Sequence, residues 1–326
     1  MILTVTPNPS LDRTYELPSL DRGRVLRAAG DRIDPGGKGV NVSRAAAAAG
    51  VPTTAVLPLG GAPGVLLAEL LGGQGVNVTA VSIAGQTRSN ISLAEPDGTL
   101  TKINATGPKL SRKESDLLLD TVRASRADAS WIAGCGSLPG GLAPDWYADL
   151  VAAARTAGVR VALDAPGPAL RAALPAGPDV IKPDTSQLAA CVGRPVSTLG
   201  DAVRAARELH ALGAGAVLAS LGRDGLLLVG EQGVCHATTG PAEPGEPGEP
   251  AGAVRGTAGA GDATLAGFLI AGGDGPGALR SALAHGAAAG RLPGSVMPAA
   301  SDLRPDRVRI TRDLPLDLPL TCPATP

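Results

Sequence analysis

Gly256-Thr-Ala-Gly-Ala-Gly-Asp262 runs directly into a segment of small and apolar residues at 263–271. Gly259 and Gly261 permit backbone conformations that other residues rarely adopt, so several main-chain N–H groups can converge on one point. The helix predicted to follow leaves its first N–H groups unpaired and carries partial positive charge at this end. The stretch therefore predicts a turn that binds a phosphate or an anionic transition state, with Asp262 placed to accept a proton from a hydroxyl. A simple helix cap is the alternative role for Asp262.

The composition narrows the class of protein. The chain has 326 residues, a formal net charge of −1 and a sequence pI of about 6.3, so it lacks the basic surplus of nucleic-acid-binding proteins. Aromatic residues make up only 2% of the chain, which also disfavours a base-stacking platform. The four cysteines have no Cys-x-x-Cys spacing, and we expect reduced thiols rather than a zinc site or disulfides. The sequence shows no charged leader and no apolar run of membrane-spanning length, so we expect a cytoplasmic protein without membrane or nucleic-acid partners.

Short apolar or β-branched runs alternate with helix-like segments along most of the chain. Predicted strands fall at 2–6, 53–60, 131–137, 159–164, 179–184 and 216–221. This alternation predicts an α/β fold with a mostly parallel, doubly wound sheet and right-handed crossovers. Asp164 ends one of these strands, at the edge where ligands collect in such sheets, with a cap or turn residue as the alternative.

Residues 12–36 and 87–105 depart from this alternation. The second range contains a period-two hairpin around the turn at 96–99. Such a hairpin usually lies outside the main sheet, and together the two ranges could build a small sheet that covers a cleft. Arg88 and Asn90 at the base of the hairpin are candidates for holding a phosphate, although a surface arginine is more often only solvated.

These observations predict the organisation of the chain. The main α/β domain is assigned to 1–11, 37–86 and 106–326, and the β lid to 12–36 and 87–105. Residues 240–252 are rich in Pro, Gly and Glu and predict a flexible loop. The Pro-rich C-terminal end predicts a frayed tail.

A second glycine-rich turn, Pro35-Gly-Gly-Lys-Gly-Val-Asn41, precedes an alanine-rich helix. It is not a Walker A loop, because Arg32 stands where that motif needs Gly and Gly39 follows the lysine. Lys38 lies between glycines at a helix start, which predicts anion binding. A solvated lysine in a flexible turn is the alternative. Asn41 offers an amide to a sugar hydroxyl.

Seven short motifs occur in order along the chain: Thr6-Pro-Asn-Pro-Ser-Leu-Asp12, Gly36-Gly-Lys-Gly-Val-Asn41, Thr87-Arg-Ser-Asn90, Gly136-Ser-Leu-Pro139, Lys182-Pro-Asp184, Ser220-Leu-Gly222 and Gly259-Ala-Gly-Asp262. With these motifs the sequence resembles, over essentially its whole length, the ribokinase or PfkB-type carbohydrate kinases, and within them the 1-phosphofructokinase and tagatose-6-phosphate kinase branch. The resemblance implies a ribokinase-like αβα sandwich with a mostly parallel central sheet and a small β-sheet lid that often forms a homodimer. It also implies phosphorylation of a sugar phosphate with ATP and Mg²⁺.

The resemblance further implies roles for individual residues. Asp262 is the expected general base, and the expected anion hole is formed by Gly259, Ala260 and Gly261. The expected sugar-phosphate site comprises Asp12, Gly37, Lys38, Asn41, Arg88, Asn90 and Ser137. The expected ATP site comprises Lys182, Asp184, Ser220, Gly222, Gly225, Thr257 and Gly259.

The chain departs from the family pattern at two places. Asp184 and Gln187 stand where the family usually has an Asn-x-x-Glu motif that helps to hold Mg²⁺. The pair still offers one carboxylate and one amide, and we assign the metal to Asp184 and Gln187. At position 256 the chain has Gly where the family usually has a polar residue. We expect this difference to affect the affinity for the nucleotide.

The leading hypothesis is conversion of fructose 1-phosphate to fructose 1,6-bisphosphate with ATP. Tagatose 6-phosphate or fructose 6-phosphate as the substrate is the first alternative. A sugar-phosphate-binding protein on the same fold, without turnover, is the second.

Overall fold

The computed structural model describes residues 1–240 and 259–325, and a large, mostly parallel sheet dominates this part of the chain. In spatial order its described strands are β15 (Val308–Thr311), β14 (Gly233–Thr239), β13 (Leu226–Gly230), β12 (Ala216–Ser220), β10 (Val180–Ile181), β9 (Arg160–Asp164), β8 (Trp131–Cys135), β1 (Ile2–Val5), β4 (Thr53–Leu59) and β5 (Asn77–Ser82). From β12 to β5 in this spatial order, each strand runs parallel to the next. β13, β14 and β15 add antiparallel strands at one edge. The predicted α/β class and parallel sheet are confirmed.

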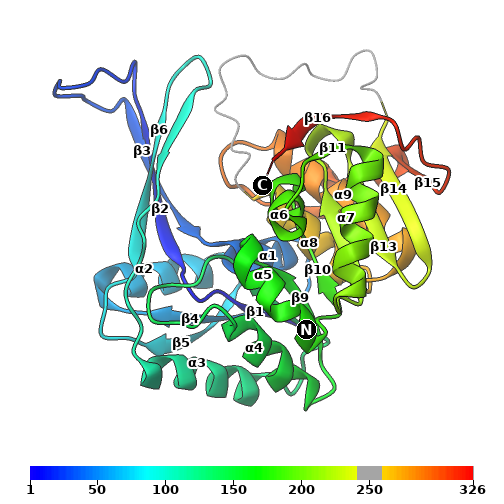
Figure 1. Cartoon of the computed structure of the whole chain (residues 1–326). Helices are drawn as coiled ribbons and strands as arrows, with labels where there is room; N and C mark the ends of the chain where they lie inside the picture. The colour runs from blue at the N-terminus through cyan, green and yellow to red at the C-terminus, as the bar shows by residue number, and fades with distance from the viewer. Residues whose placement is uncertain (241–258, 326) are drawn as a thin grey trace.

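Helices cover both faces of this sheet, which explains why its inner strands are continuous apolar runs. All four residues of β1 are buried. Leu3 and Val5 enter the core under one helical layer, and Ile2 enters the core under the other. The first layer contains α3 (Arg112–Ser125), α4 (Trp146–Arg155), α5 (Gly167–Ala173), α6 (Thr185–Val192) and α7 (Leu199–Ala211). The second contains α1 (Lys38–Ala48), α8 (Ala260–Ile270) and α9 (Gly275–Arg291), and α2 (Gly61–Gly72) packs against α1 and β4 (Figure 1).

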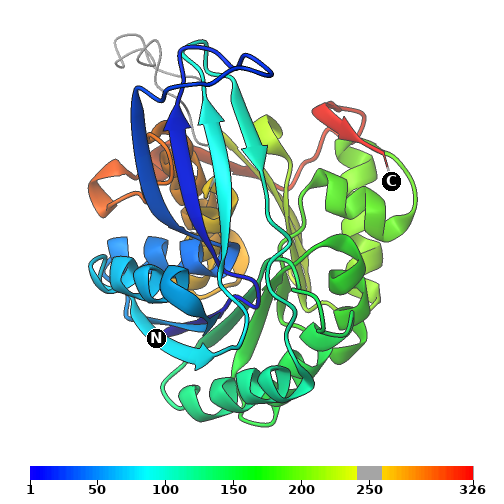
Figure 2. The same cartoon turned by 90° about the vertical axis from the view of Figure 1, so that its left-hand side faces the viewer.

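A small separate sheet stands beside the α/β body. Its described strands, in spatial order, are β3 (Gly30–Gly36), β2 (Ser10–Glu16), β6 (Arg88–Ala94) and β7 (Leu100–Ile103). β6 and β7 form the hairpin predicted around 96–99. Figures 1 and 2 show that these strands rise well clear of the helical layers. Their lower ends, where β2 and β6 begin and β3 ends, adjoin the α/β body.

The C-terminal segment differs from the predicted frayed tail. Its strand β16 (Pro319–Ala324) pairs antiparallel with β11 (Val196–Thr198), and Leu320 is buried. Its two prolines cost little here, because an edge strand has backbone positions that need no hydrogen-bond donor. The predicted loop at 240–252 lies outside the described residues, apart from Gly240.

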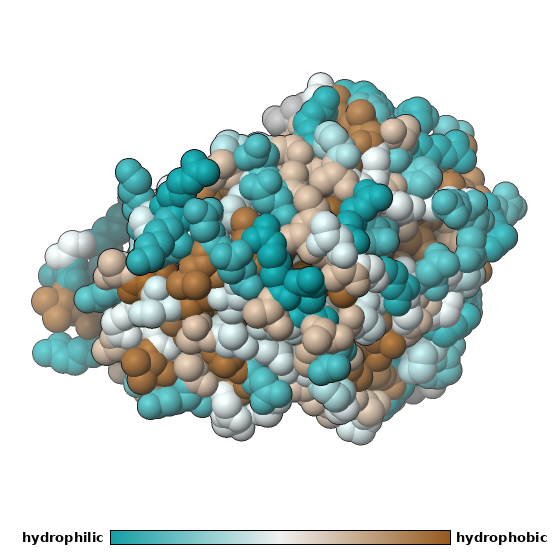
Figure 3. Space-filling model, turned by 90° about the horizontal axis from the view of Figure 1, so that it is seen from below, coloured by the Kyte–Doolittle hydropathy of each residue, from teal (hydrophilic) through white to brown (hydrophobic). Residues whose placement is uncertain are grey.

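The surface carries no extended apolar face on the side seen from below in Figure 1. Polar and apolar residues alternate there in small patches (Figure 3). The large exposed apolar side chains that the structure describes, such as Val25, Val65 and Leu212, are scattered over different elements. None of the described helices is long and apolar enough to cross a membrane.

Candidate active site

The strand order reverses between β1 and β8, since the chain winds from β1 toward β4 and β5 and then returns to β8, β9 and β10. Open α/β sheets bind their ligands at this kind of switch point, beyond the carboxyl ends of the strands. A cavity of about 680 Å³, the first cavity, lies here. It is lined by residues from these strand ends, from α1 and α8, and from the small sheet. Among them are Asp12, Gly37, Lys38, Asn41, Arg88, Asn90, Ser137, Lys182, Asp184, Ser220, Gly259, Gly261 and Asp262.

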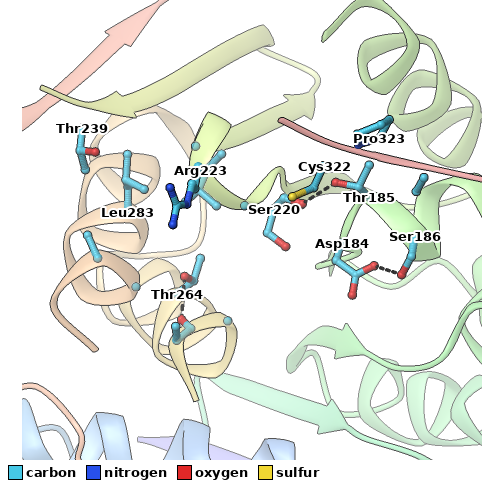
Figure 4. Close-up of a pocket in the computed structure, with 18 residues that line it drawn as sticks. Asp184, Thr185, Ser186, Ser220, Arg223, Thr239, Thr264, Leu283, Cys322 and Pro323 are labelled. Carbon is cyan, nitrogen blue, oxygen red and sulfur yellow. Dashed lines mark hydrogen bonds between the residues drawn. The ribbon is translucent and has the colours of Figure 1, made fainter. Parts of the chain in front are cut away.

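A second cavity of about 550 Å³ adjoins the first and shares Asp184, Ser220 and Gly261 with it (Figure 4). Its other lining residues come from the turn after β12, from the ends of β13 and β14, from α6, α8 and α9, and from the C-terminal strand. They include Thr185, Gly222, Arg223, Gly225, Thr239, Ala260, Thr264, Leu283, Cys322 and Pro323. The sequence-predicted sugar and ATP residues thus fall into two connected cavities. Thr257 lies outside the described residues.

Helix α8 begins at the junction of the two cavities. Gly259 caps it with φ of 99°, in the left-handed region that favours glycine. The backbone N–H groups of the first helical residues, Ala260 and Gly261, have no intrahelical acceptor, because a helix supplies none at that position. A Cβ on Gly261 would lie 3.4 Å from the ammonium of Lys182. Backbone donors, a helix N-terminus and an ammonium therefore converge where the cavities meet.

Asp262 lies in the first turn of this helix and is buried. Its Oδ2 accepts a hydrogen bond from Nδ2 of Asn41 at 2.9 Å. Burial and the nearby Asp164 carboxylate raise the pKa of Asp262 to about 6, although the Asn41 hydrogen bond and both neighbouring lysines oppose this change. Asp262 is therefore ionised at neutral pH but basic enough to accept a proton.

Asp164, at the end of β9, joins the two lysines of the site. Its Oδ1 lies 2.5 Å from Nζ of Lys38, and its Oδ2 lies 2.8 Å from Nζ of Lys182. Burial alone would raise the pKa of Asp164, but the two ammonium groups hold it below its usual value. Burial likewise opposes the charge of Lys38, yet the Asp164 carboxylate raises the pKa of that ammonium. Lys38 therefore remains cationic, and the carboxylate fixes both lysine side chains in position.

The base of the small sheet supplies a polar wall of the first cavity. Asp12 Oδ1 accepts hydrogen bonds from Ser10 Oγ at 2.8 Å and Asn90 Nδ2 at 2.9 Å. Arg88 donates to the backbone oxygens of Ala105 at 2.7 Å and Asn8 at 2.9 Å. These bonds hold the guanidinium of Arg88 at the cavity wall.

Asp184 and Gln187 form a reciprocal cap at the start of α6. Asp184 Oδ1 accepts from the Gln187 N–H at 2.8 Å, and Gln187 Oε1 accepts from the Asp184 N–H at 2.8 Å. Gln187 Nε2 donates to the Ala165 oxygen at 2.8 Å. Asp184 lines both cavities, but Gln187 is not among the described residues that line either of them.

The sequence did not indicate two contacts within the site. Asp164 was predicted to lie at the edge of the sheet where ligands bind, but its contact with two lysines from distant segments leaves no local sequence signal. Arg44 donates from Nη1 to Oδ1 of Asn41 at 3.1 Å. The i, i+3 spacing of Asn41 and Arg44 on a predicted helix is a signal that could have indicated this contact.

The fold and the two-cavity site define a class of enzyme, the small-molecule kinases of the ribokinase type. Residues 7–298 match the pfkB family of carbohydrate kinases, and the chain belongs to this family. It is thus an ATP-dependent sugar kinase.

Relatives agree with this assignment. The 1-phosphofructokinase of Rhodobacter capsulatus is 37% identical over 272 residues, which cover 83% of each chain. The 1-phosphofructokinase of Haloferax volcanii is 39% identical over 272 residues, covering 83% of this chain and 84% of the relative. The crystal structure of phosphofructokinase-2 from Escherichia coli with substrates and products is 31% identical, with a TM-score of 0.82, over 92% of this chain and 96% of that chain.

Proposed function

We propose that the protein transfers the γ-phosphoryl group of ATP to the C6 hydroxyl of fructose 1-phosphate, giving fructose 1,6-bisphosphate and ADP. The first cavity would hold the sugar phosphate and the second cavity would hold ATP. The observation that carries this proposal is the position of Asp262 and the α8 N-terminus at the junction of the two cavities. The names of the two relatives above support fructose 1-phosphate as the acceptor.

The chemical step follows from the groups at this junction. As the hydroxyl oxygen attacks the γ-phosphorus, Asp262 accepts the hydroxyl proton, and the bond from the γ-phosphorus to the bridging oxygen of ADP breaks. The backbone N–H groups of Ala260 and Gly261 would stabilise the charge on the transferring phosphoryl group. Lys182, held by Asp164, would add a fixed positive charge at the same point. Positioning and charge neutralisation therefore supply most of the catalysis in this account.

A phosphorylated rather than a neutral sugar fits the cations of the first cavity. Arg88 and Lys102 reach this cavity from the small sheet, and Lys38 reaches it from α1. We assign the phosphate of the sugar to Lys38, Arg88 and Asn90, and the sugar hydroxyls to Asp12, Gly37, Asn41 and Ser137. Fructose 6-phosphate and tagatose 6-phosphate carry the same charge and remain alternative acceptors.

We propose Mg²⁺ as the cofactor, bound mainly by the nucleotide phosphates. Asp184 offers a carboxylate that lines both cavities, which fits a cation that needs only one or two protein carboxylates. Among the described residues no cluster of three or more His, Cys, Asp or Glu could hold a metal. The Gln187 amide is used in the α6 cap, so its predicted role in metal binding would be indirect. When bound, Mg²⁺ would neutralise charge on the β- and γ-phosphates.

We also propose a homodimer formed through the small sheet. This sheet stands clear of the body, Ile103 on β7 is exposed, and Val25 in the loop between β2 and β3 is exposed as well. Light scattering of the purified protein tests the dimer directly.

The expected compartment is the cytoplasm, where Cys135, Cys191 and Cys235, which are buried, and the exposed Cys322 would stay reduced.

The experiment that tests the function measures ADP release with Mg-ATP and each of the three sugar phosphates. We expect the highest kcat/KM for fructose 1-phosphate. A higher value for another sugar would keep the mechanism and change the substrate. Binding of a sugar phosphate without any turnover would instead support the non-catalytic alternative.

A further inference from the structure

The C-terminal strand β16 forms part of the wall of the second cavity. Cys322, Pro323 and Ala324 line this cavity together with Ser220 and the turn that follows β12. Figure 4 shows Cys322 and Pro323 beside Thr185 and Ser220, with Thr239 and Leu283 at the opposite end of the cavity. None of the described residues that line the first cavity comes from β16. The strand is thus placed to affect only the second cavity.

A carboxylate fixes β16 to the turn that borders this cavity. Asp224 ends the short helix η2 (Gly222–Asp224), which follows β12. Its Oδ2 accepts from the Thr321 N–H at 2.7 Å, and its Oδ1 accepts from Thr321 Oγ1 at 2.7 Å. Both carboxylate oxygens therefore accept hydrogen bonds from one residue of the strand. Hydrogen bonds to a charged acceptor are stronger than those between neutral groups. The turn and the strand are held together as one unit.

The strand is also held from its other side. β16 pairs with β11, the Leu199 N–H donates to the Leu318 oxygen at 2.9 Å, and Leu320 is buried. These contacts keep β16 in place without help from a ligand. A wall that is already ordered loses little conformational entropy when a ligand binds against it.

We propose that β16 is part of the nucleotide site, where it contacts bound ATP and sets its affinity, and that Asp224 and Thr321 are positioning residues for this strand. The inference rests on the proposed function, since it takes ATP as the occupant of the second cavity. Cys322, Pro323 and Ala324 are uncharged, so they contribute shape and exclusion of water rather than charge. Disturbing β16 therefore changes the KM for ATP and not the KM for the sugar phosphate.

The first test uses Cys322, because it is exposed and the other three cysteines are buried. N-ethylmaleimide labelling of the native protein is followed by mass spectrometry, with Cys322→Ser as the control for site assignment. At an ATP concentration ten times its Kd, competition predicts labelling about tenfold slower, whereas fructose 1-phosphate leaves the rate unchanged. Calorimetry on the same sample measures whether ATP binds.

The outcomes separate this inference from the proposed function. Slower labelling with ATP, and not with the sugar phosphate, supports contact between β16 and the nucleotide. An unchanged rate while calorimetry records ATP binding overturns the inference and leaves the kinase assignment intact. An absence of ATP binding by calorimetry contradicts both.

The second test perturbs the tether. Thr321→Val removes the hydroxyl that donates to Asp224 and keeps the side-chain volume, and we expect the KM for ATP to rise about tenfold. Thr321→Ser restores the hydroxyl and should restore the KM. Thr311→Val on β15 removes the hydroxyl of another exposed threonine and serves as the matched control. Equal increases in the KM values for ATP and sugar, or no change in either, would contradict the positioning role.

Discussion

Asn41 Nδ2 donates a hydrogen bond to Asp262 Oδ2 at 2.9 Å, while Asn41 Oδ1 accepts one from Arg44 at 3.1 Å. Arg44 thereby fixes which end of the amide faces Asp262. A hydrogen bond donated to a carboxylate favours its charged form. The pKa of Asp262 therefore depends on a residue of α1, far away in the sequence.

Replacing Asn41 by Ala should move the pH dependence of the reaction. Loss of the donor raises the pKa of Asp262 above about 6, so less of the base is ionised near pH 6.5. We expect kcat/KM to fall more at pH 6.5 than at pH 8, as seen in a pH profile of ADP release. An equal loss at both pH values would show that Asn41 acts only by binding the sugar.

The ionised Asp262 carboxylate should lower the free energy of unfolding at neutral pH. Its folded-state pKa of about 6 lies above its usual value of 3.8, so the fold favours the protonated form. The stability linked to this preference is present in full below pH 4 and is lost as the pH rises through 6. Asp262→Asn should therefore be more stable than the parent at pH 8, by up to about 3 kcal/mol. Most of the gain should be absent at pH 4, and urea melts at both pH values measure it. A gain that did not depend on pH would contradict the titration of Asp262.

Asp164→Asn should destabilise the fold and disturb both lysines. Lys182 would keep a buried charge without its carboxylate, and breaking a buried ion pair in this way costs about 3–5 kcal/mol. Asp120→Asn is the control, because it breaks a solvent-exposed pair with Arg123 and should cost less than about 1 kcal/mol. Urea melts at pH 7 compare the two variants. Similar losses in both would mean that the pairs at Asp164 add little to stability.

Gly36→Ala should weaken binding of the sugar phosphate. A Cβ at this position would clash with the carboxyl group of Asp12, so this side chain must shift from its present position in the wall of the first cavity. We expect the KM for the sugar to rise about tenfold, the scale of one lost hydrogen bond to a charged group, with the KM for ATP unchanged. Gly72→Ala, where nothing lies within 4 Å, is the control. An unchanged KM for the sugar would exclude Asp12 from its binding.

Local sequence patterns predicted most of the fold and many of the residues that line the site. The alternation of apolar runs and helices predicted the parallel sheet, because strands buried on both faces must be apolar throughout. Glycines before Lys38 and Asp262 predicted both helix starts. Asp184-Thr-Ser-Gln187 could have been recognised as a capping box from its spacing alone.

The remaining features depend on contacts between distant segments. The Asp164 carboxylate meets Lys38 and Lys182 only because β9 and β10 end, and α1 begins, at the same edge of the sheet. The C-terminal strand was missed because its proline content suggested disorder, whereas its pairing depends on β11. Its place beside the second cavity also depends on Asp224, a residue almost 100 positions away from Thr321.

The most direct test of the account compares kcat for the parent protein and Asp262→Asn with saturating Mg-ATP and fructose 1-phosphate. General-base catalysis predicts that kcat is lower by a factor of about 10²–10⁴ in the variant. Calorimetry should show that the variant still binds both substrates. The parent should also show an ascending pH profile with an apparent pKa of about 6. Near-normal turnover in Asp262→Asn would contradict the central claim that this carboxylate accepts the proton of the sugar hydroxyl.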